Sequence, residues 1–334
     1  MLKIILIVLP FLFIAAFWIM AVRERRLAGN AASHGFFRRN GAVIGAYLLV
    51  AVGFWAVMMI VLPQLYMVDY SFHPKLIAAE LGGPKDVYTL ENYRYFLFGR
   101  ANEEGWNETH LKAFFLTIVA SIAVTFLNFC LSYPLAYYLA QAAPMQRVRV
   151  LMLALIVPFW VNEILRAFAL RIMFGTSGLI NNTLVGLGLI TERIDFLGLD
   201  VGLYVGLSYA YLLMMIFPLY NAIESLDKNQ IEAARDLGAP WWHIHLFVVM
   251  PFAKPGIASG CTMVFMLAAG ALAAPLFLGG PNTLWFTPIV YDRFFQAFNW
   301  PQGAAYALVL LLTCIIFVMA VLKVFKVSLG EITR

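Results

Sequence analysis

Charged residues inside an apolar stretch are the first candidates for chemistry in this sequence. Asn162, Glu163 and Arg166 follow a long apolar run, and apolar residues continue beyond them. Charges at membrane depth are costly, and they usually face a cavity or pair with one another. Glu163 and Arg166 are three residues apart, so on a helix they share a face and can form an ion pair. The alternative is a solute path in which Asn162 and Glu163 meet a polar or cationic solute.

Aromatic and acidic residues elsewhere extend the possible path. Trp160, Tyr209 and Tyr211 can offer ring faces to a cation, although packing and interfacial aromatics are the more frequent case. Asp292 and Arg293 are adjacent in an outer loop, where a surface ion pair is the favoured interpretation and a ligand site is the alternative. The candidate pathway residues are Trp160, Asn162, Glu163, Arg166, Tyr211 and Asp292.

The most polar passage in the second half of the chain, residues 227–255, predicts a docking element. Asp227 and Gln230 suit a helix N-cap and its reciprocal third position, so a short helix is expected over 228–237. A glycine then ends this helix, a proline starts a second one, and two further prolines interrupt the chain before the next apolar run. These four residues are Gly238, Pro240, Pro251 and Pro255.

The sequence predicts no catalytic residue, metal or cofactor on this chain. It has no Gly-Lys dipeptide, and therefore no Walker A loop to cradle nucleotide phosphates. His243 and His245 are two residues apart and point in different directions on a helix, so a shared metal is not expected. Energy must come from a partner that hydrolyses nucleotide or from an ion gradient acting through Glu163. A membrane enzyme built on Glu232, His243 and His245 is the rival class.

The composition places these residues in an all-α integral membrane protein. Of 334 residues, 63% are hydrophobic and only 12% are charged, about half the charged share of a soluble domain. The net charge of +5 comes from arginines in short loops, which excludes a nucleic-acid-binding face. Cys130, Cys261 and Cys314 lie in apolar segments without metal-ligand spacing, so we interpret them as packing residues.

Seven segments are long enough to cross a membrane, which takes about 20 apolar residues. The first ends in an arginine-rich stretch, so we interpret it as a retained helix and not as a cleaved signal. Gly256 and Gly260 have the four-residue spacing that permits close helix approach. The predicted spans cover residues 4–22, 41–62, 113–140, 150–173, 201–220, 256–278 and 303–322.

Positive charge sets the orientation of these spans. The loop 23–40 has five arginines and one glutamate, and short loops rich in Lys and Arg face the cytoplasm. Alternation then predicts a periplasmic N-terminus and a cytoplasmic C-terminus, with the passage 227–255 on the cytoplasmic side. The loop 63–112 is expected on the outer side.

The same cytoplasmic passage resembles a known motif. Glu232-Ala233-Ala234, then three residues, Gly238, and finally Val248-Val249-Met250-Pro251 resemble the Glu-Ala-Ala loop of permease subunits of ABC importers. Val248 and Met250 replace the usual Ile and Leu conservatively. In that family the loop forms a coupling helix that seats in a groove of the ATPase subunit. The coupling residues implied are Glu232, Ala233, Ala234, Asp236, Gly238 and Pro251.

Three longer phrases, at 155–181, 225–239 and 299–305, look like the first permease subunit of the spermidine/putrescine branch of type I importers. The resemblance implies a domain of about six core helices at 41–334, with a coupling loop at about 223–254. The extra N-terminal helix and its linker, 1–40, depart from that pattern. Glu163 also departs from it, because a small polar residue is expected there. An opine or an amino-acid derivative is therefore the alternative to a polyamine.

The resemblance also implies partners. A second permease subunit would complete the path, a dimer of ATPase subunits would use ATP and Mg, and a periplasmic binding protein would deliver a small cationic solute. The chain itself would contact membrane lipid, in the bacterial inner membrane, and no nucleic acid. Closure of the ATPase dimer would push the coupling helix as a rigid body.

Overall fold

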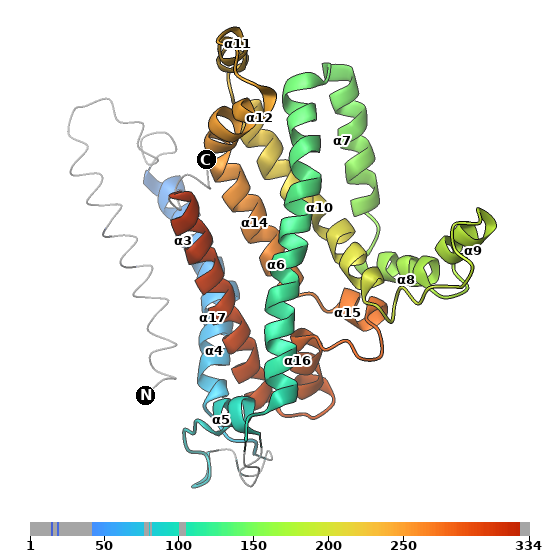
Figure 1. The fold of residues 1–334 in the computed structure, drawn as a ribbon. Helices are drawn as coiled ribbons and strands as arrows, with labels where there is room; N and C mark the ends of the chain where they lie inside the picture. Colours follow the sequence, from blue (N-terminus) through green and yellow to red (C-terminus); the bar gives the residue numbers. More distant parts are fainter. Residues whose placement is uncertain are drawn as a thin grey trace. The chain divides into compact units, whose positions relative to one another are not determined.

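The computed structural model describes residues 42–76, 80, 82–99 and 105–327, together with Ala15 and Ile19 (Figure 1). Apart from those two residues, the predicted span 4–22 and the linker 23–40 lie outside the described part. The regular secondary structure of the described residues is helical. The chain divides into two units, residues 1–92 with 299–308, and residues 93–298 with 309–334.

The first unit contains one long membrane-spanning helix with a π turn in its middle. α3 (Ala42–Ala56) runs through η1 (Val57–Val61) into α4 (Leu62–Ser71). The prediction that this span ends at residue 62 and that a loop begins at Pro63 is wrong. Pro63 lies in the first turn of α4, where a missing N–H is tolerated, and the π turn before it absorbs the change in hydrogen bonding.

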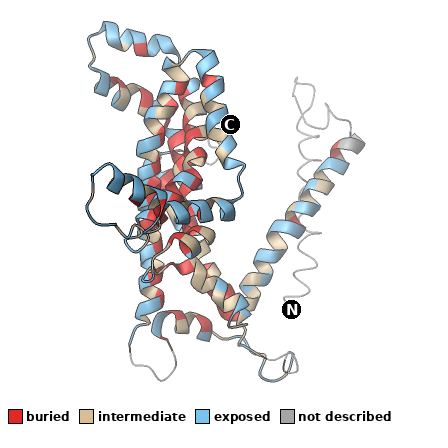
Figure 2. Ribbon diagram, turned by 90° about the vertical axis from the view of Figure 1, so that its right-hand side faces the viewer, coloured by how far each residue is buried: buried red, intermediate tan, exposed pale blue. Residues whose placement is uncertain are grey.

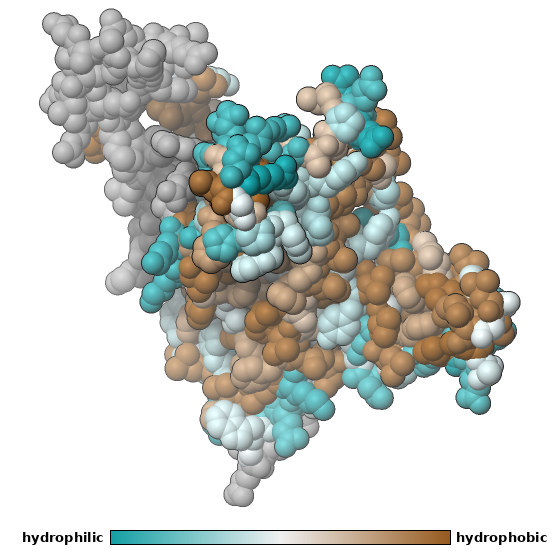
Figure 3. Space-filling view, turned by 45° about the horizontal axis from the view of Figure 1, so that its top comes forward, coloured by the Kyte–Doolittle hydropathy of each residue, from teal (hydrophilic) through white to brown (hydrophobic). Residues whose placement is uncertain are grey.

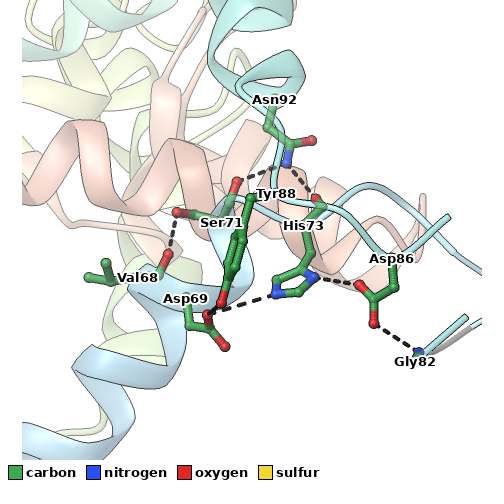
Figure 4. Close-up of polar contacts among 8 residues, drawn as sticks. All are labelled: Val68, Asp69, Ser71, His73, Gly82, Asp86, Tyr88 and Asn92. Atoms are coloured by element: carbon green, nitrogen blue, oxygen red, sulfur yellow. Dashed lines mark hydrogen bonds and ion pairs between the residues drawn. The ribbon is translucent and has the colours of Figure 1, made fainter. Parts of the chain in front are cut away.

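A polar cluster fixes the chain beyond α4 (Figure 4). His73 Nδ1 lies 2.6 Å from Asp86 Oδ1, and its Nε2 lies 3.7 Å from Asp69 Oδ1. The Tyr88 hydroxyl donates to Asp69 at 2.9 Å, and this hydrogen bond raises the pKa of the Tyr88 phenol. The Asn92 amide donates to the His73 carbonyl at 2.9 Å. The segment between α4 and the next helix is therefore held by specific polar contacts.

The second unit is a helical bundle with short helices at both ends (Figure 1). Its elements up to residue 224 are α5 (Glu91–Phe98), α6 (Glu108–Tyr137), η3 (Tyr138–Ala142), α7 (Met145–Phe159), α8 (Glu163–Phe174), α9 (Leu179–Gly186) and α10 (Val201–Glu224). They continue with α11 (Lys228–Asp236), α12 (Trp241–Ile244), η4 (His245–Val249), α13 (Met250–Phe252), α14 (Lys254–Ala269), α15 (Ala273–Leu278), α16 (Phe286–Phe295) and most of α17 (Trp300–Phe325).

Four described helices are long and apolar enough to cross a membrane unbroken, and two bent pairs raise the number to six. The unbroken four are Tyr47–Ser71, Glu108–Ala142, Val201–Glu224 and Trp300–Phe325. They bear out the predicted spans at 113–140, 201–220 and 303–322. The predicted span 41–62 has its counterpart in the first of them.

The other two predicted spans are bent. A continuous helix over 150–173 is wrong, because Met145–Phe159 and Glu163–Gly186 meet at 91°. Pro158 lies at the end of α7, and Asn162 caps a new helix by accepting from the Ile164 N–H at 2.9 Å. A single span over 256–278 is also wrong. Its helix α14 ends at Ala269, while upstream it joins Trp241–Phe252 at a 75° bend, as the prolines at 251 and 255 predict.

Helix α10 is the centre of this unit, and it packs against α6 and α14. Buried residues gather where the helices of the bundle meet, and exposed residues cover its outside (Figure 2). Glycines on α14 allow the close approach. A Cβ added to Gly256 would lie 2.5 Å from the Pro218 carbonyl oxygen, and one on Gly260 would lie 2.6 Å from Met215 Sδ. The interpretation of these glycines as packing residues is therefore confirmed.

We expect Gly256→Ala to destabilise the bundle, because its new methyl group must displace the α10 backbone. Overpacking of this kind costs about 1–3 kcal/mol. Gly53→Ala is the matched control, since a Cβ at this helical position meets nothing within 4 Å. The measurement is the temperature at which half of the detergent-solubilised protein loses its monodisperse peak. Equal behaviour of the two variants would contradict the packing role.

Candidate functional site

A cavity lies beside the interruption between α14 and α15. Its volume is about 530 Å³, and its walls come from α8, α10, α14, α15 and α16 together with that interruption. Non-helical backbone at membrane depth is tolerated where it lines such a space. The lining residues are Glu163, Ile164, Tyr211, Met266, Leu267, Gly270, Ala271, Leu272, Ala273, Leu276, Phe277 and Tyr291.

Glu163 is the charged residue among those lining residues. It is the first residue of α8, because Asn162 caps that helix, and a carboxylate is favoured at a helix N-terminus. The Tyr211 hydroxyl, on α10, donates to Glu163 Oε1 at 3.5 Å. Tyr211 is buried and Glu163 is exposed, so the carboxylate remains open to a partner from the cavity. The local electrostatics favour a cation.

The ion-pair interpretation of Glu163 and Arg166 is wrong for this structure. The ion pairs found between described residues link His73 to Asp69 and to Asp86, and Lys85 to Glu80. The Arg166 guanidinium instead lies 5.8 Å from the ring centre of Phe159 and 5.5 Å from that of Tyr209. Glu163 and Arg166 share a helix face but form no ion pair, because the guanidinium packs against the rings of Phe159 and Tyr209. Tyr209 contacts a cation of the protein itself.

The predicted pathway residues are only partly brought together. Glu163 and Tyr211 line the cavity, whereas Arg166 does not. Asn162 acts as a helix cap through its bond to Ile164. Trp160 is 84% exposed and lies outside the lining set.

Asp292 and Arg293, which were predicted in an outer loop, lie on helix α16. They form no ion pair with each other among the described contacts. Arg293 Nη2 instead lies 3.2 Å from His110 Nε2 on α6, and its guanidinium lies 5.7 Å from the ring centre of Tyr95. The neighbouring Tyr291 faces the cavity where Asp292 was expected. On a helix, adjacent side chains point in different directions, so only one of them can face the path.

Two groups of contacts hold the cavity wall beyond α15 and α8. Arg171 Nη1 donates to the Phe277 carbonyl at 2.7 Å and so satisfies the C-terminal end of α15. Asp200 accepts from the Gly280 N–H at 3.2 Å and from the Thr283 hydroxyl. Sequence reasoning missed this wall because residues 256–278 read as one apolar run. Gly270 and the paired glycines at 279–280 were the available signals.

The polar passage at residues 227–255 forms a helix–turn–helix at one end of the unit. Asp227 accepts from the Asn229 N–H at 3.0 Å, which confirms the predicted cap of α11. Gly238 has a φ of +78°, the left-handed conformation that ends the helix. Ile231 is buried in the core, while Glu232, Ala233 and Asp236 are exposed. One face of α11 is thus anchored and the other is free to dock.

Apolar side chains surround this free face. Leu237 is 88% exposed and Trp241 is 75% exposed, and exposed apolar patches mark interaction sites. Hydrophilic residues gather at the same end of the unit, above the hydrophobic bundle (Figure 3). The mixture of charged and apolar groups is typical of a surface that binds another protein.

A membrane bundle with interrupted helices around a cavity and a docking element at one end defines the membrane component of a transporter. Residues 132–325 match the family described as binding-protein-dependent transport system inner membrane component. The chain belongs to this family, and it is a membrane-spanning permease subunit of an ABC importer, in which a separate subunit hydrolyses ATP.

Individual relatives agree with this assignment. The chain is 33% identical over 264 residues to the spermidine/putrescine transport system permease protein PotB of Escherichia coli K12, covering 79% of this chain and 91% of PotB. It is 30% identical over 274 residues to PotB of Haemophilus influenzae, covering 81% and 91%. The structure of a bacterial alginate ABC transporter in complex with alginate pentasaccharide-bound periplasmic protein has a TM-score of 0.68 at 15% identity, covering 88% of this chain and 98% of that chain.

We expect Gly238→Val to impair transport, because a β-branched residue is strained at positive φ by about 1–2 kcal/mol. Nothing lies within 4 Å of an added Cβ, so the effect is conformational and not steric. Gly238→Asn is the matched variant, because asparagine tolerates this conformation. Solute uptake by the assembled importer, normalised to membrane-inserted protein, is the measurement. Equal uptake by the Val and Asn variants would argue against a need for this turn.

Proposed function

We propose that this chain forms half of the translocation path for a small cationic solute, with a spermidine- or putrescine-like polyamine as the leading class. The observation that carries the proposal is Glu163, a carboxylate exposed to the cavity with no cationic residue among the described lining. The relatives named as spermidine/putrescine permeases support the same class.

The remaining walls suit the rest of such a solute. A polyamine alternates ammonium groups with methylene stems, and it therefore needs both acceptors and apolar contact. Leu267 and Phe277 provide apolar surface, and the rings of Tyr211 and Tyr291 can contact an ammonium group. The interruption at Gly270 adds backbone carbonyls, which coordinate cations in other broken membrane helices.

The helix α11 is proposed as the coupling helix that docks on the partner ATPase. Glu232 and Asp236 offer charge to that partner, Ala233 and Ala234 permit close approach, and Pro251 shapes the return to the membrane. The ATPase dimer holds ATP and Mg, and this chain needs no cofactor of its own. A second permease would face the cavity, and a periplasmic binding protein would deliver the solute from the outer side.

We propose the same topology that the positive charges predict. The N-terminus is periplasmic, the C-terminus is cytoplasmic, and the loop at about 223–254 faces the cytoplasm. The segment 1–40 is an addition to an importer domain at 41–334. Lipid surrounds the exposed apolar faces of the spans.

We expect Glu163→Gln to weaken uptake of radiolabelled spermidine. A hydrogen bond to a charged group contributes about 1.5–3 kcal/mol, and each 1.4 kcal/mol is about tenfold. The spermidine concentration for half-maximal uptake should therefore rise by roughly ten- to a hundredfold. The measurement is initial uptake rate by cells that express the complete importer.

The matched control is Glu192→Gln, which removes the same charge from an exposed outer-loop position outside the cavity lining. It should leave uptake unchanged. Equal uptake by wild type and Glu163→Gln would sink the role of this carboxylate. If wild type transports an opine or amino-acid derivative but no polyamine, the solute class is wrong while the path stands.

Thiol labelling tests the orientation. Asn229→Cys lies on α11, and Asn182→Cys lies on α9, in the segment predicted to be outside. We expect a membrane-impermeant maleimide, added to intact cells with a permeable outer membrane, to label the Asn182 variant and to spare the Asn229 variant. Inverted vesicles should give the opposite result. Labelling of Asn229→Cys from the outside would overturn the topology.

A further inference from the structure

The coupling passage, residues 227–255, is attached on both sides of α11 to one continuous helical run, α6 with η3. Before α11, the Gln141 amide donates to the carbonyls of Ile223 and Leu226 at 2.7 and 3.2 Å. After α11, His245 Nδ1 lies 2.8 Å from the Tyr133 hydroxyl. The short helix that faces the partner is thus held between two bonds to one element.

Burial and a neighbouring ring support these hydrogen bonds. Ile223 and Leu226 are almost fully buried at the end of α10, where a helix has few backbone donors left for its carbonyls. The Ile223 carbonyl accepts from the Leu226 N–H at 3.2 Å as well as from Gln141. The His245 ring also lies 4.4 Å from the ring of Tyr137, edge to face. Tyr133 and Tyr137 are four residues apart and share one face of α6, and Gln141 follows four residues later in η3.

The other end of α6 is attached to the cavity wall. The buried Phe286 N–H, which opens α16, donates to Thr117 Oγ1 at 2.8 Å. Arg293, in the last turn of α16, lies 3.2 Å from His110 in the first turn of α6. Both ends of α16 therefore bond to α6, and the residue between them that faces the cavity is Tyr291.

The middle of α6 packs against α10 and α14 but forms no described side-chain hydrogen bond to them. Hydroxyls there bond back to their own helix, as Ser121 does to the Thr117 carbonyl and Thr125 to the Ser121 carbonyl at 2.7 Å each. Asn128 and Ser132 are buried, and their side chains have no hydrogen-bond partner among the described residues. Between its two attachments, α6 therefore makes no described side-chain bond that would fix it against α10 or α14.

We infer that α6 is the strut that transmits movement of the coupling passage to the α16 wall of the cavity, with Tyr133–His245 and Gln141 at its cytoplasmic end and Thr117–Phe286 at its outer end. The inference rests on the proposed function. Together α6 and η3 form one run of 35 residues, about 50 Å at 1.5 Å per residue. Figure 1 shows this run reaching from the α11–α12 end of the unit to α16.

The strut makes the coupling reciprocal. A displacement of α11 by the ATPase biases the position of α16, and occupation of the outer side biases α11 by the same free energy. A two-state element that both sites bias is the physical requirement for such coupling. Tyr133, Gln141 and Thr117 are positioning residues in this scheme, because none of them lines the cavity or lies on the docking face.

The test uses the complete importer reconstituted in lipid vesicles, with ATP hydrolysis measured with and without spermidine-loaded binding protein. Tyr133→Phe and Thr117→Val each remove one hydroxyl with little change of shape. We expect each to lower the stimulation by binding protein about fivefold or more, the lower end of typical allosteric coupling. Hydrolysis without binding protein and assembly of the complex should stay at wild-type levels. Gln141→Leu tests the attachment before α11 in the same way, because it removes the hydrogen bonds to the carbonyls of Ile223 and Leu226.

Two matched variants control for loss of a hydroxyl alone. Thr125→Val lies on the same helix and removes a bond made only to its own backbone. Tyr138→Phe removes a partly exposed phenol with no described hydrogen bond. Both should keep full stimulation. Loss of stimulation in these controls to the same extent would show a general effect on α6 and overturn the inference.

The double variant Thr117→Val, Tyr133→Phe separates a shared path from two local defects. The two positions are about 24 Å apart along the helix, a separation at which independent effects multiply. If both bonds serve one strut, the double variant should lose no more stimulation than the worse single variant. A product of the two losses would overturn the strut. A wrong solute class gives a different result: spermidine-loaded binding protein would then fail to stimulate ATP hydrolysis by the wild-type importer as well.

Discussion

Inside a bilayer every backbone N–H and C=O must find its partner within the protein, and this constraint decides where the helices of this chain can break. The breaks fall at 160–162, at Ala253 and at 270–272, and each is satisfied locally. Asn162 caps α8, prolines flank the bend before α14, and the Thr287 hydroxyl donates to the Ala269 carbonyl at 2.9 Å where α14 ends. The cavity lies where the start of α8 and the interruption between α14 and α15 come together beside α10. The carboxylate at the start of α8 and a non-helical stretch of backbone therefore line the same cavity. Six straight, unbroken spans would not bring them together.

Much of the architecture could be predicted from the sequence because lipid permits so few structures. Apolar length alone located the unbroken spans, and the cap at Asp227 with the glycine at 238 located the coupling helix. The angles could not be predicted. Pro63 and Pro158 are chemically alike, yet a π turn lets the helix continue past Pro63, while the chain turns through 91° after Pro158. The difference lies in the surroundings of each proline, such as the cap at Asn162, which the proline itself does not predict.

The candidate site was harder to predict, because helical periodicity assigns faces but not partners. Glu163 and Arg166 share a face, and the sequence therefore favoured an ion pair. The rings of Phe159 and Tyr209 take the arginine instead, and the carboxylate is left to the cavity. Adjacent positions on α16 show the same limit. Asp292 was chosen for its charge, but the helix turns Tyr291 to the cavity. Chemistry identified the kinds of residue correctly, whereas direction depended on breaks that the apolar pattern conceals.

The two polar features of the chain therefore have different relations to the bilayer. The charged residues of α11 are exposed, so they cost little, and under the proposed function they would serve recognition by the ATPase. Glu163 lies among apolar walls, where an unpaired carboxylate is unfavourable unless a cation or water accompanies it. Under the proposed function, a cation that enters the cavity would relieve this cost. The 3.5 Å contact with Tyr211 leaves the carboxylate without a strong internal partner, so it would not hold the protein closed around an empty site. Under the proposed strut, movement of α16 would change how closely Tyr291 approaches the solute, and release would then follow from the position of a wall without a change in charge.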